Sequence, residues 1–336
     1  MVKFKGWDKG CVSLGQGKIE QGIFPVIISA SRSTDIPAFF AKWFINRLHA
    51  GYMKWSNPFN AKQVQYVSFE KARLFVFWTK NPGPLIPYLS EIDSLDKNYY
   101  FQFTLNNYEP EQLEPNVPSL AERIETFQKL SSLVGKERVI WRYDPLVLSD
   151  KLTIDEHIKR ISLIAEQLSA FTNKLVFSFA DIQSYRKVKN NLLKVIQYKE
   201  FTPTLMHEFG EKLLKMNESF GFTTATCGES VDLEKYDIEH NHCIDENLMV
   251  KIFNKDAELL KFLGYEKTLF GEKWDYFKDK GQRKECGCTV SKDIGMYNTC
   301  SHFCSYCYAN NSRKAVQNNL RKHHPNMEFL VDRSFK

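Results

Sequence analysis

Three cysteines near the carboxyl end of the chain have a spacing that suits metal chemistry. They are Cys300, Cys304 and Cys307 in the segment NTCSHFCSYCYAN, a C-x-x-x-C-x-x-C arrangement with Tyr306 directly before the last thiol. Three thiolates can hold three corners of a 4Fe-4S cubane and leave the fourth iron open to a substrate or cofactor. A zinc knuckle completed by His302 or another cysteine is the alternative, although such knuckles more often pair two C-x-x-C hooks.

Four further cysteines lie outside this motif. Cys286 and Cys288 form a short hook, Cys227 follows an expected strand, and Cys243 lies in an expected loop. Four soft ligands without an open position would suit a closed second site, either another 4Fe-4S cluster or structural zinc. The alternative is that Cys227 and Cys243 are small core residues, as free cysteines often are.

The composition bounds the class of protein. The chain has 336 residues, 43% of them hydrophobic, and lacks a run of about 18 apolar residues that would predict a membrane span. Its first residues carry no apolar signal segment, so we expect a cytoplasmic protein without a membrane partner. The net charge is +6, but acidic residues are interspersed almost throughout. Only the basic stretch at 313–324 suggests contact with phosphates, so nucleic acid is a weakly supported partner.

Short strand-like runs alternate with helix-like segments. The runs are nearly continuous in apolar residues, which favours strands buried on both faces of a parallel sheet: 25–31, 74–79, 99–105, 138–144, 174–181 and 222–227. Helices are expected over 37–50, 119–134 and 153–168, the last beginning with a Thr-x-x-Glu capping box. The alternation predicts an α/β fold, a full or partial TIM-like (β/α) barrel, whose site would lie at the carboxyl ends of the strands.

The cysteine motif resembles that of the radical S-adenosylmethionine superfamily. The resemblance implies that the amino and carboxylate groups of S-adenosylmethionine bind the fourth iron, that a reducing donor such as flavodoxin or ferredoxin supplies an electron, and that a 5′-deoxyadenosyl radical attacks an unknown substrate. The chain also resembles the spore-photoproduct-lyase-like branch through ordered segments that match that branch: Ser33 to Pro37, Thr79 to Pro82, Leu113 to Pro115 and Arg142 to Pro145.

The position of the motif departs from that branch, in which the cysteine loop follows the first strand. A circular permutation of the barrel would reconcile the two, because barrel termini lie close together. The segment 293–298 would then be the strand before the motif, 308–323 the helix after it, and 25–31 the second strand. We expect an N-terminal extension (1–24), the main part of the barrel (25–230), a connector with the extra cysteines (231–290) and a cysteine-rich segment (291–336) that completes the barrel. Four segments, ISASRSTDIPAFF, FWTKNP, RVIWRYDP and CGCTVSKDIGMYNTCSHFCSYCYAN, make the chain as a whole resemble the bacterial domain-of-unknown-function family 1848.

The resemblance also suggests roles for polar residues at the strand ends. Hydroxyl groups would contact the methionyl or ribose part of S-adenosylmethionine, and one of two cations would pair with its carboxylate; these candidates are Ser31, Thr79, Thr104 and Ser178 for the hydroxyls and Lys80 or Arg142 for the cation. Arg142 is alternatively an ion-pair partner of Asp144 or Glu114. Asp181 and Glu229 are candidate proton-transfer groups, and Asp35 is expected to cap the helix near Pro37.

Two other functions remain open from the sequence. One is a zinc or iron–sulfur nucleic-acid-binding protein that stacks bases on Trp55, Trp78 or Trp141, although the last two are expected inside strands. The other is a degenerate barrel that keeps its cluster for structure or electron transfer. Formation of 5′-deoxyadenosine would separate the radical enzyme from both.

Overall fold

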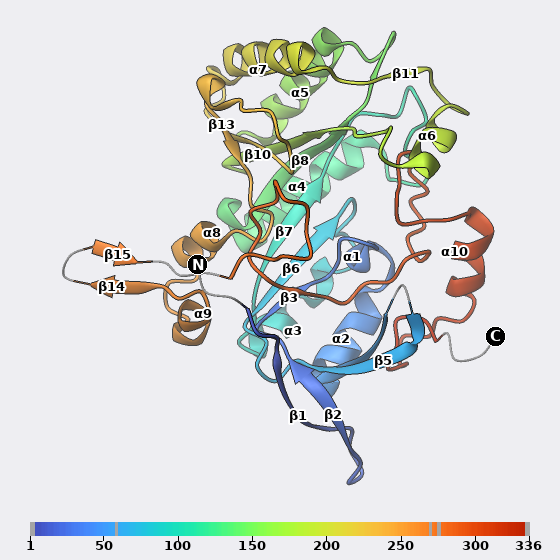
Figure 1. Cartoon of the computed structure of the whole chain (residues 1–336), viewed down its shortest axis with the longest axis vertical. Coiled ribbons are helices and arrows are strands. Elements are labelled where there is room, and N and C mark those ends of the chain that lie inside the picture. The colour runs from blue at the N-terminus through green and yellow to red at the C-terminus, as the bar shows by residue number, and fades with distance from the viewer. Residues whose placement is uncertain (1–3, 58–59, 269–270, 274–276, 333–336) are drawn as a thin grey trace.

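The chain folds around one large parallel sheet. The computed structural model describes residues 4–57, 60–268, 271–273 and 277–332. The sheet has eight strands, and every pair of neighbours runs parallel (Figure 1). In spatial order they are β16 (Lys292–Asp293), β3 (Ile27–Ser29), β6 (Leu74–Thr79), β7 (Asn98–Thr104), β8 (Val139–Leu146), β10 (Lys174–Phe179), β12 (Thr223–Thr226) and β13 (Ile238–His240).

The strand order follows the sequence with one exception. The last strand of the chain, β16, pairs with the first strand of the sheet, β3, through Lys292 opposite Ile28 and Asp293 opposite Ser29. Ser29 Oγ donates a hydrogen bond of 2.9 Å to Asp293 Oδ2, which ties the two strand ends together. Among the described residues the hydrogen-bonded sheet ends at β13 on one side and at β16 on the other. The fold is therefore mixed α/β with a large parallel sheet.

Helices pack against both faces of this sheet. Its buried side chains alternate, so that Phe75 and Phe77 of β6 join a large cluster with residues of α2, α4, α5 and α7, whereas Leu74 and Val76 face the opposite side. That opposite side is covered by α8 and α9. The helices are α1 (Ile36–Phe39), α2 (Ala41–Ala50), α3 (Leu89–Ser94), α4 (Leu120–Val134), α5 (Ile154–Leu168), α6 (Arg186–Leu192), α7 (Pro203–Asn217), α8 (Glu246–Ile252), α9 (Ala257–Phe262) and α10 (Arg313–Leu320).

Smaller sheets decorate this framework. The expected N-terminal extension forms a hairpin of β1 (Asp8–Ser13) and β2 (Ile19–Phe24). Two strands from the expected main part, β4 (Tyr52–Asn57) and β5 (Asn60–Ser68), form a second antiparallel pair, and β2 joins β5 in parallel to make one sheet. Two small pairs complete the strands: β9 (Leu148–Ser149) with β11 (Tyr198–Lys199), and β14 (Glu266–Thr268) with β15 (Gly271–Lys273).

The expected helices form, with two differences. The helix expected over 308–323 is the shorter α10 (Arg313–Leu320), because Ser312 caps it by accepting a hydrogen bond from Ala315 N. Ser119 and Thr153 cap α4 and α5 by accepting hydrogen bonds from the backbone of the third helical residue. The helix expected over 37–50 is instead divided at Phe40, whose backbone (φ −133°, ψ 20°) leaves the helical region between α1 and α2. Asp35 caps the first of these two helices, beside the cavity described below.

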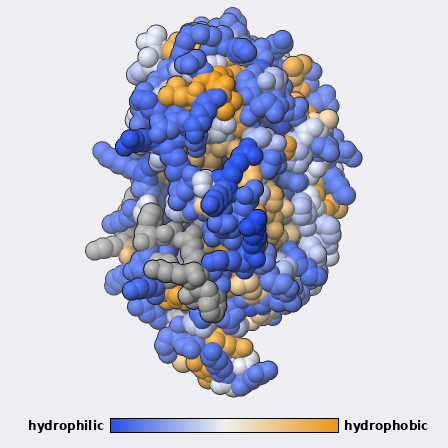
Figure 2. Space-filling view, turned by 90° about the vertical axis from the view of Figure 1, so that its right-hand side faces the viewer, coloured by the Kyte–Doolittle hydropathy of each residue, from blue (hydrophilic) through white to orange (hydrophobic). Residues whose placement is uncertain are grey.

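The surface turned to the viewer in Figure 2 is mostly hydrophilic, with hydrophobic residues gathered in small groups. None of the helices in the described ranges combines the length and the apolar character that crossing a bilayer demands.

Candidate active site and cysteine centres

A cavity of about 410 Å³ opens at the carboxyl ends of the parallel strands. Because parallel strands all end at the same edge of a sheet, residues far apart in the sequence meet there. The cavity is lined by all six of the expected cofactor contacts, by both expected proton-transfer groups, and by seven of the eight cysteines: Ser31, Thr79, Lys80, Thr104, Arg142, Ser178; Asp181, Glu229; Cys227, Cys243, Cys286, Cys288, Cys300, Cys304 and Cys307. Cys11, the eighth, is exposed elsewhere.

The motif cysteines lie on a loop between β16 and α10. This motif loop (299–309) turns tightly, with a left-handed backbone at Phe303 (φ 54°) and a hydrogen bond of 3.0 Å from Cys307 N to Cys304 O. Ser305 N donates to Leu113 O at 2.8 Å, and Asn310 Nδ2 donates to Cys300 O at 2.8 Å. The loop is therefore held in place by neighbouring backbone, with its three thiols facing one cavity.

Gly295 allows the chain to enter this loop close to β3. A Cβ atom at Gly295 would lie 1.8 Å from Ser31 Oγ and 2.6 Å from Ser33 Oγ. Only glycine therefore fits between β16 and the serine-rich turn that follows β3. The same close approach brings Ser31 to the wall of the cavity.

A buried charge network holds the motif loop to the sheet. Lys80 Nζ donates to Glu114 Oε1 at 2.7 Å and to the Tyr306 hydroxyl at 2.9 Å. Tyr306 in turn donates to Glu114, and Arg123 Nη1 lies 3.5 Å from Glu114 Oε2. Lys80, a candidate partner for a cofactor carboxylate, thus already has a carboxylate partner within the protein.

Arg142 is also engaged. Its guanidinium is paired with Asp144 Oδ2 through Nε at 3.1 Å and Nη2 at 2.5 Å, which is the ion pair weighed above as the alternative role. Its Nη1 donates to Gln102 Oε1 at 3.2 Å and points at Cys243 Sγ at 3.1 Å. Ser178 donates to the other oxygen of Asp144. Arg142 therefore links the strand ends to the second group of cysteines.

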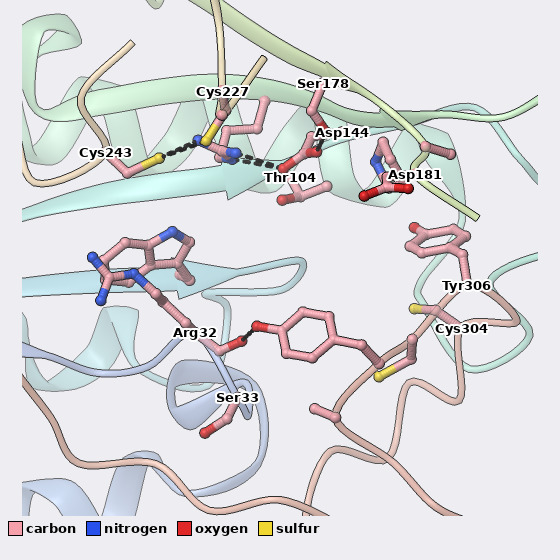
Figure 3. A pocket seen from close by; sticks show the side chains of 18 of the residues that line it. Arg32, Ser33, Thr104, Asp144, Ser178, Asp181, Cys227, Cys243, Cys304 and Tyr306 are labelled. Atoms are coloured by element: carbon pink, nitrogen blue, oxygen red, sulfur yellow. Dashed lines mark hydrogen bonds and ion pairs between the residues drawn. The ribbon is translucent and has the colours of Figure 1, made fainter. Parts of the chain in front are cut away.

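The four remaining cysteines gather at the inner side of the cavity. Cys227 Sγ and Cys243 Sγ are 3.2 Å apart, and Cys288 Sγ accepts hydrogen bonds from Cys243 N at 3.2 Å and Ile244 N at 3.4 Å. The thiol of Cys288 is also hydrogen-bonded to that of Cys286. Figure 3 shows Cys227 and Cys243 across the cavity from Cys304. The structure thus brings together the four cysteines named for a second metal site.

The two candidate proton-transfer groups differ in environment. Glu229 accepts a hydrogen bond of 3.1 Å from Phe179 N, and burial raises its pKa to about 7. Asp181 is exposed at the rim. A carboxyl group with a pKa near neutrality can both donate and accept a proton, so the geometry favours Glu229 over Asp181 for such a role.

Asp35 and His302 form a buried pair that the sequence suggested only in part. Asp35 Oδ1 accepts from Ala38 N at 3.0 Å, so the expected cap is confirmed. Its Oδ2 accepts from Lys80 N at 2.7 Å and lies 2.8 Å from His302 Nε2. Both partners are buried, with His302 only 2% exposed. This pair fixes the motif loop to the start of α1.

Arg32 is a site residue that the sequence did not single out. Its guanidinium lines the cavity and lies over the Trp78 ring at 5.0 Å from the centroid, while its buried Nη2 has no hydrogen-bond partner. A buried guanidinium nitrogen without a hydrogen-bond partner at a cavity wall is suited to an anionic ligand. The signal in the sequence was its place in the run Ser31 to Ser33, directly after a strand.

The expected stacking tryptophans do not form an exposed surface. Trp141 is fully buried in the core, Trp78 lies under Arg32, and the ring centroid of Trp55 lies 3.2 Å from the Lys292 ammonium.

In the described ranges, no group of three or more His, Cys, Asp or Glu side chains is arranged to hold a single metal ion. Sulfur ligands of a cubane are farther apart than those of one ion, because each binds a different iron.

Comparison with other proteins places the chain in a family. No curated protein matches it. One solved structure, described as a "putative alpha-L-fucosidase" from Bacteroides thetaiotaomicron VPI-5482, is 12% identical, with 58% of this chain and 75% of that chain covered and a TM-score of 0.23, which is too low to support an argument. A family model matches residues 27–309, which include the parallel sheet and the motif loop. The chain belongs to the family described as "Domain of unknown function (DUF1848)".

Proposed function

We propose that this chain is an iron–sulfur enzyme of the radical S-adenosylmethionine type, with its cluster on Cys300, Cys304 and Cys307. The observation that carries the proposal is the meeting of these three thiols with polar strand ends in one cavity at the carboxyl edge of a parallel sheet. Sites of α/β enzymes lie at that edge. A motif that only stabilised a loop would not need to face a cavity lined by hydroxyl and charged groups.

The order of the strands supports a permuted barrel as the scaffold. In such a barrel the strand before the motif would be the first and β3 the second, and β16 indeed pairs in parallel with β3. The remaining strands then follow in sequence order to β13. Joining the ends of a barrel and cutting it elsewhere keeps the site intact, because the pairing of the strands is unchanged.

The thiols fit a cluster chemically. Burial raises the pKa of Cys300 to about 12 and also raises the pKa of Cys304 and Cys307. Buried thiols of this kind become thiolates when a metal replaces their protons. They are positioned on one pinned turn with Lys80 close by, whose positive charge would offset part of the negative charge of three thiolates.

When bound at the open iron, S-adenosylmethionine would supply a carbon-centred radical that takes a hydrogen atom from the substrate. The chain itself would position the ligands: Ser31, Thr79 and Thr104 offer hydroxyl groups at the wall, and Arg32 offers a guanidinium nitrogen, Nη2, that has no hydrogen-bond partner. Since the guanidinium lies on the Cys243 side of the cavity, away from the motif loop (Figure 3), we assign it to an anionic group of the substrate.

The proposal is tested by anaerobic purification and incubation with dithionite and S-adenosylmethionine. We expect 5′-deoxyadenosine from the native chain and from Cys11→Ala, whose exposed thiol lies outside the cavity. Cys304→Ala should abolish product and leave at most a labile three-iron remnant at the motif. Product formation by Cys304→Ala at the native rate, or zinc at the motif after anaerobic preparation, would overturn the assignment. An iron–sulfur cluster without product would instead favour a structural or electron-transfer role.

A further inference from the structure

The cysteines outside the motif are brought together from three separate parts of the chain. Cys227 follows β12, Cys243 lies between β13 and α8, and Cys286 and Cys288 lie on the hook before β16. Their thiols form a continuous series of contacts in the order Cys227, Cys243, Cys288, Cys286. Chance burial of small residues does not require three loops to converge on one point.

The surroundings of these thiols are those of negatively charged sulfur. Arg142 Nη1 points at Cys243 Sγ at 3.1 Å, Asn241 Nδ2 donates to the same sulfur at 3.4 Å, and two backbone N–H groups donate to Cys288 Sγ. Each of the two sulfurs thus faces two donors; a neutral thiol is a weak acceptor that does not need them, whereas metal-bound thiolates are regularly surrounded by donors. Arg142 is buried, so its charge would act here with little screening by solvent.

The hook is shaped to present both of its sulfurs. A Cβ atom at Gly287 would lie 1.9 Å from His242 Nε2, so the residue between the two cysteines must be glycine for the hook to pack against that ring. His242 is itself held by Glu246, whose Oε1 lies 2.9 Å from Nδ1. Thr289 Oγ1 donates to the other oxygen of Glu246 at 3.0 Å, which secures the end of the hook.

We propose that Cys227, Cys243, Cys286 and Cys288 hold a second iron–sulfur cluster, on the side of the cavity opposite the motif loop. All four thiols border the 410 Å³ cavity. Structural zinc is normally enclosed on all sides by its four ligands. A single zinc ion at these thiols would instead face the open cavity. The two sulfurs at 3.2 Å must also separate, since ligands on tetrahedral zinc are roughly 3.8 Å apart and those on a cubane are farther still. This inference goes beyond the proposed function and does not depend on radical chemistry at the motif.

The experiment is a count of iron and acid-labile sulfide in anaerobically purified full-length protein. The native chain and Cys11→Ala should contain about eight irons per chain. A variant with Cys300→Ala, Cys304→Ala and Cys307→Ala should keep about half of the iron, and so should Cys286→Ala. In the latter variant, S-adenosylmethionine should still change the electron paramagnetic resonance signal of the remaining cluster.

A second variant keeps every thiol and changes only the shape of the hook. Gly287→Ala should lose about half of the iron as well, because the new Cβ would displace the hook from His242. If it and Cys286→Ala both retain the native iron content, the proposal is overturned.

The motif triple variant separates the two proposals. If it is folded by circular dichroism and contains no metal, or one zinc and no iron, the second cluster does not exist, while the motif cluster stands. If it keeps about four irons but the native chain forms no 5′-deoxyadenosine, the second cluster stands and the radical enzyme does not.

Discussion

Glu114 is the residue on which the attachment of the motif loop depends most. It lies in the segment between β7 and α4, is 8% exposed, and faces two cations, Lys80 and Arg123, as well as the Tyr306 hydroxyl. Burial alone would raise the pKa of Glu114, but the charges of Lys80 and Arg123 outweigh it and hold the pKa below its usual range. The ionised carboxylate is therefore the form that the folded protein requires.

Glu114→Gln keeps the shape of this side chain and removes its charge. Two buried cations, with Arg123 only 1% exposed, would then lack their shared counterion. Removal of one partner from a buried ion pair lowers the free energy of unfolding by about 3–5 kcal/mol. Because Glu114 pairs with both Lys80 and Arg123, we expect Glu114→Gln to lie toward the upper end of this range. Lys80→Met should cost less, about 2–3 kcal/mol, because Glu114 keeps Arg123.

The assay is guanidinium denaturation of the metal-free protein in reductant, followed by circular dichroism and tryptophan fluorescence. Glu125→Gln on the exposed face of α4 is the matched control and should leave the midpoint unchanged. In the double variant Lys80→Met with Glu114→Gln, the cost should be smaller than the sum of the two by about 1–3 kcal/mol, since the two residues interact directly. A cost below about 1 kcal/mol for Glu114→Gln, or strict additivity, would refute the reasoning.

Three further predictions concern the scaffold. Burial lowers the pKa of His157 from 6.5 to about 4. The free energy of unfolding should therefore be highest above pH 6.5 and fall by about 3 kcal/mol as the pH drops toward 4. In urea titrations His157→Gln should reduce this dependence on pH, and the same dependence in the variant and the native chain would contradict the account. Gly295→Ala should lower the thermal midpoint and the iron content of the motif, because its Cβ would lie 1.8 Å from a serine hydroxyl. Gly281→Ala is the control and should show neither change, because the nearest atom there belongs to a flexible carboxylate at 3.2 Å. Asp35→Ala removes a helix cap and the partner of His302. It should lower the free energy of unfolding by about 2–4 kcal/mol in the guanidinium assay and speed hydrogen exchange in the motif loop. Unchanged exchange would show that the loop is held without this pair.

The sequence alone predicted the six inner strands of the large sheet but not its two edges: β13 was not predicted, and the strand expected over 293–298 is reduced to β16 at Lys292–Asp293, because neither edge strand is long enough to give an apolar run. Buried parallel strands are nearly continuous runs of apolar residues, and the runs at 74–79 and 174–181 became β6 and β10 within two residues. Local capping chemistry placed α4 and α5 equally well. The division at Phe40 was not predictable, because the segment 37–50 reads as one helix and neither glycine nor proline stands at the break.

Spacing in the sequence also predicted that the three motif thiols lie together, since they fall within eight residues, and in the structure all three line one cavity. Which other groups face them was decided by the tertiary structure. Lys80 and Arg142 were equivalent candidates in the sequence for pairing with a cofactor carboxylate, yet each forms an ion pair with a carboxylate of the protein. Arg32, in contrast, has a guanidinium nitrogen without a hydrogen-bond partner. The convergence of Cys227 and Cys243 on the hook likewise depends on the parallel pairing of β12 with β13. Such pairings join segments through long-range packing, which no local pattern of residues encodes.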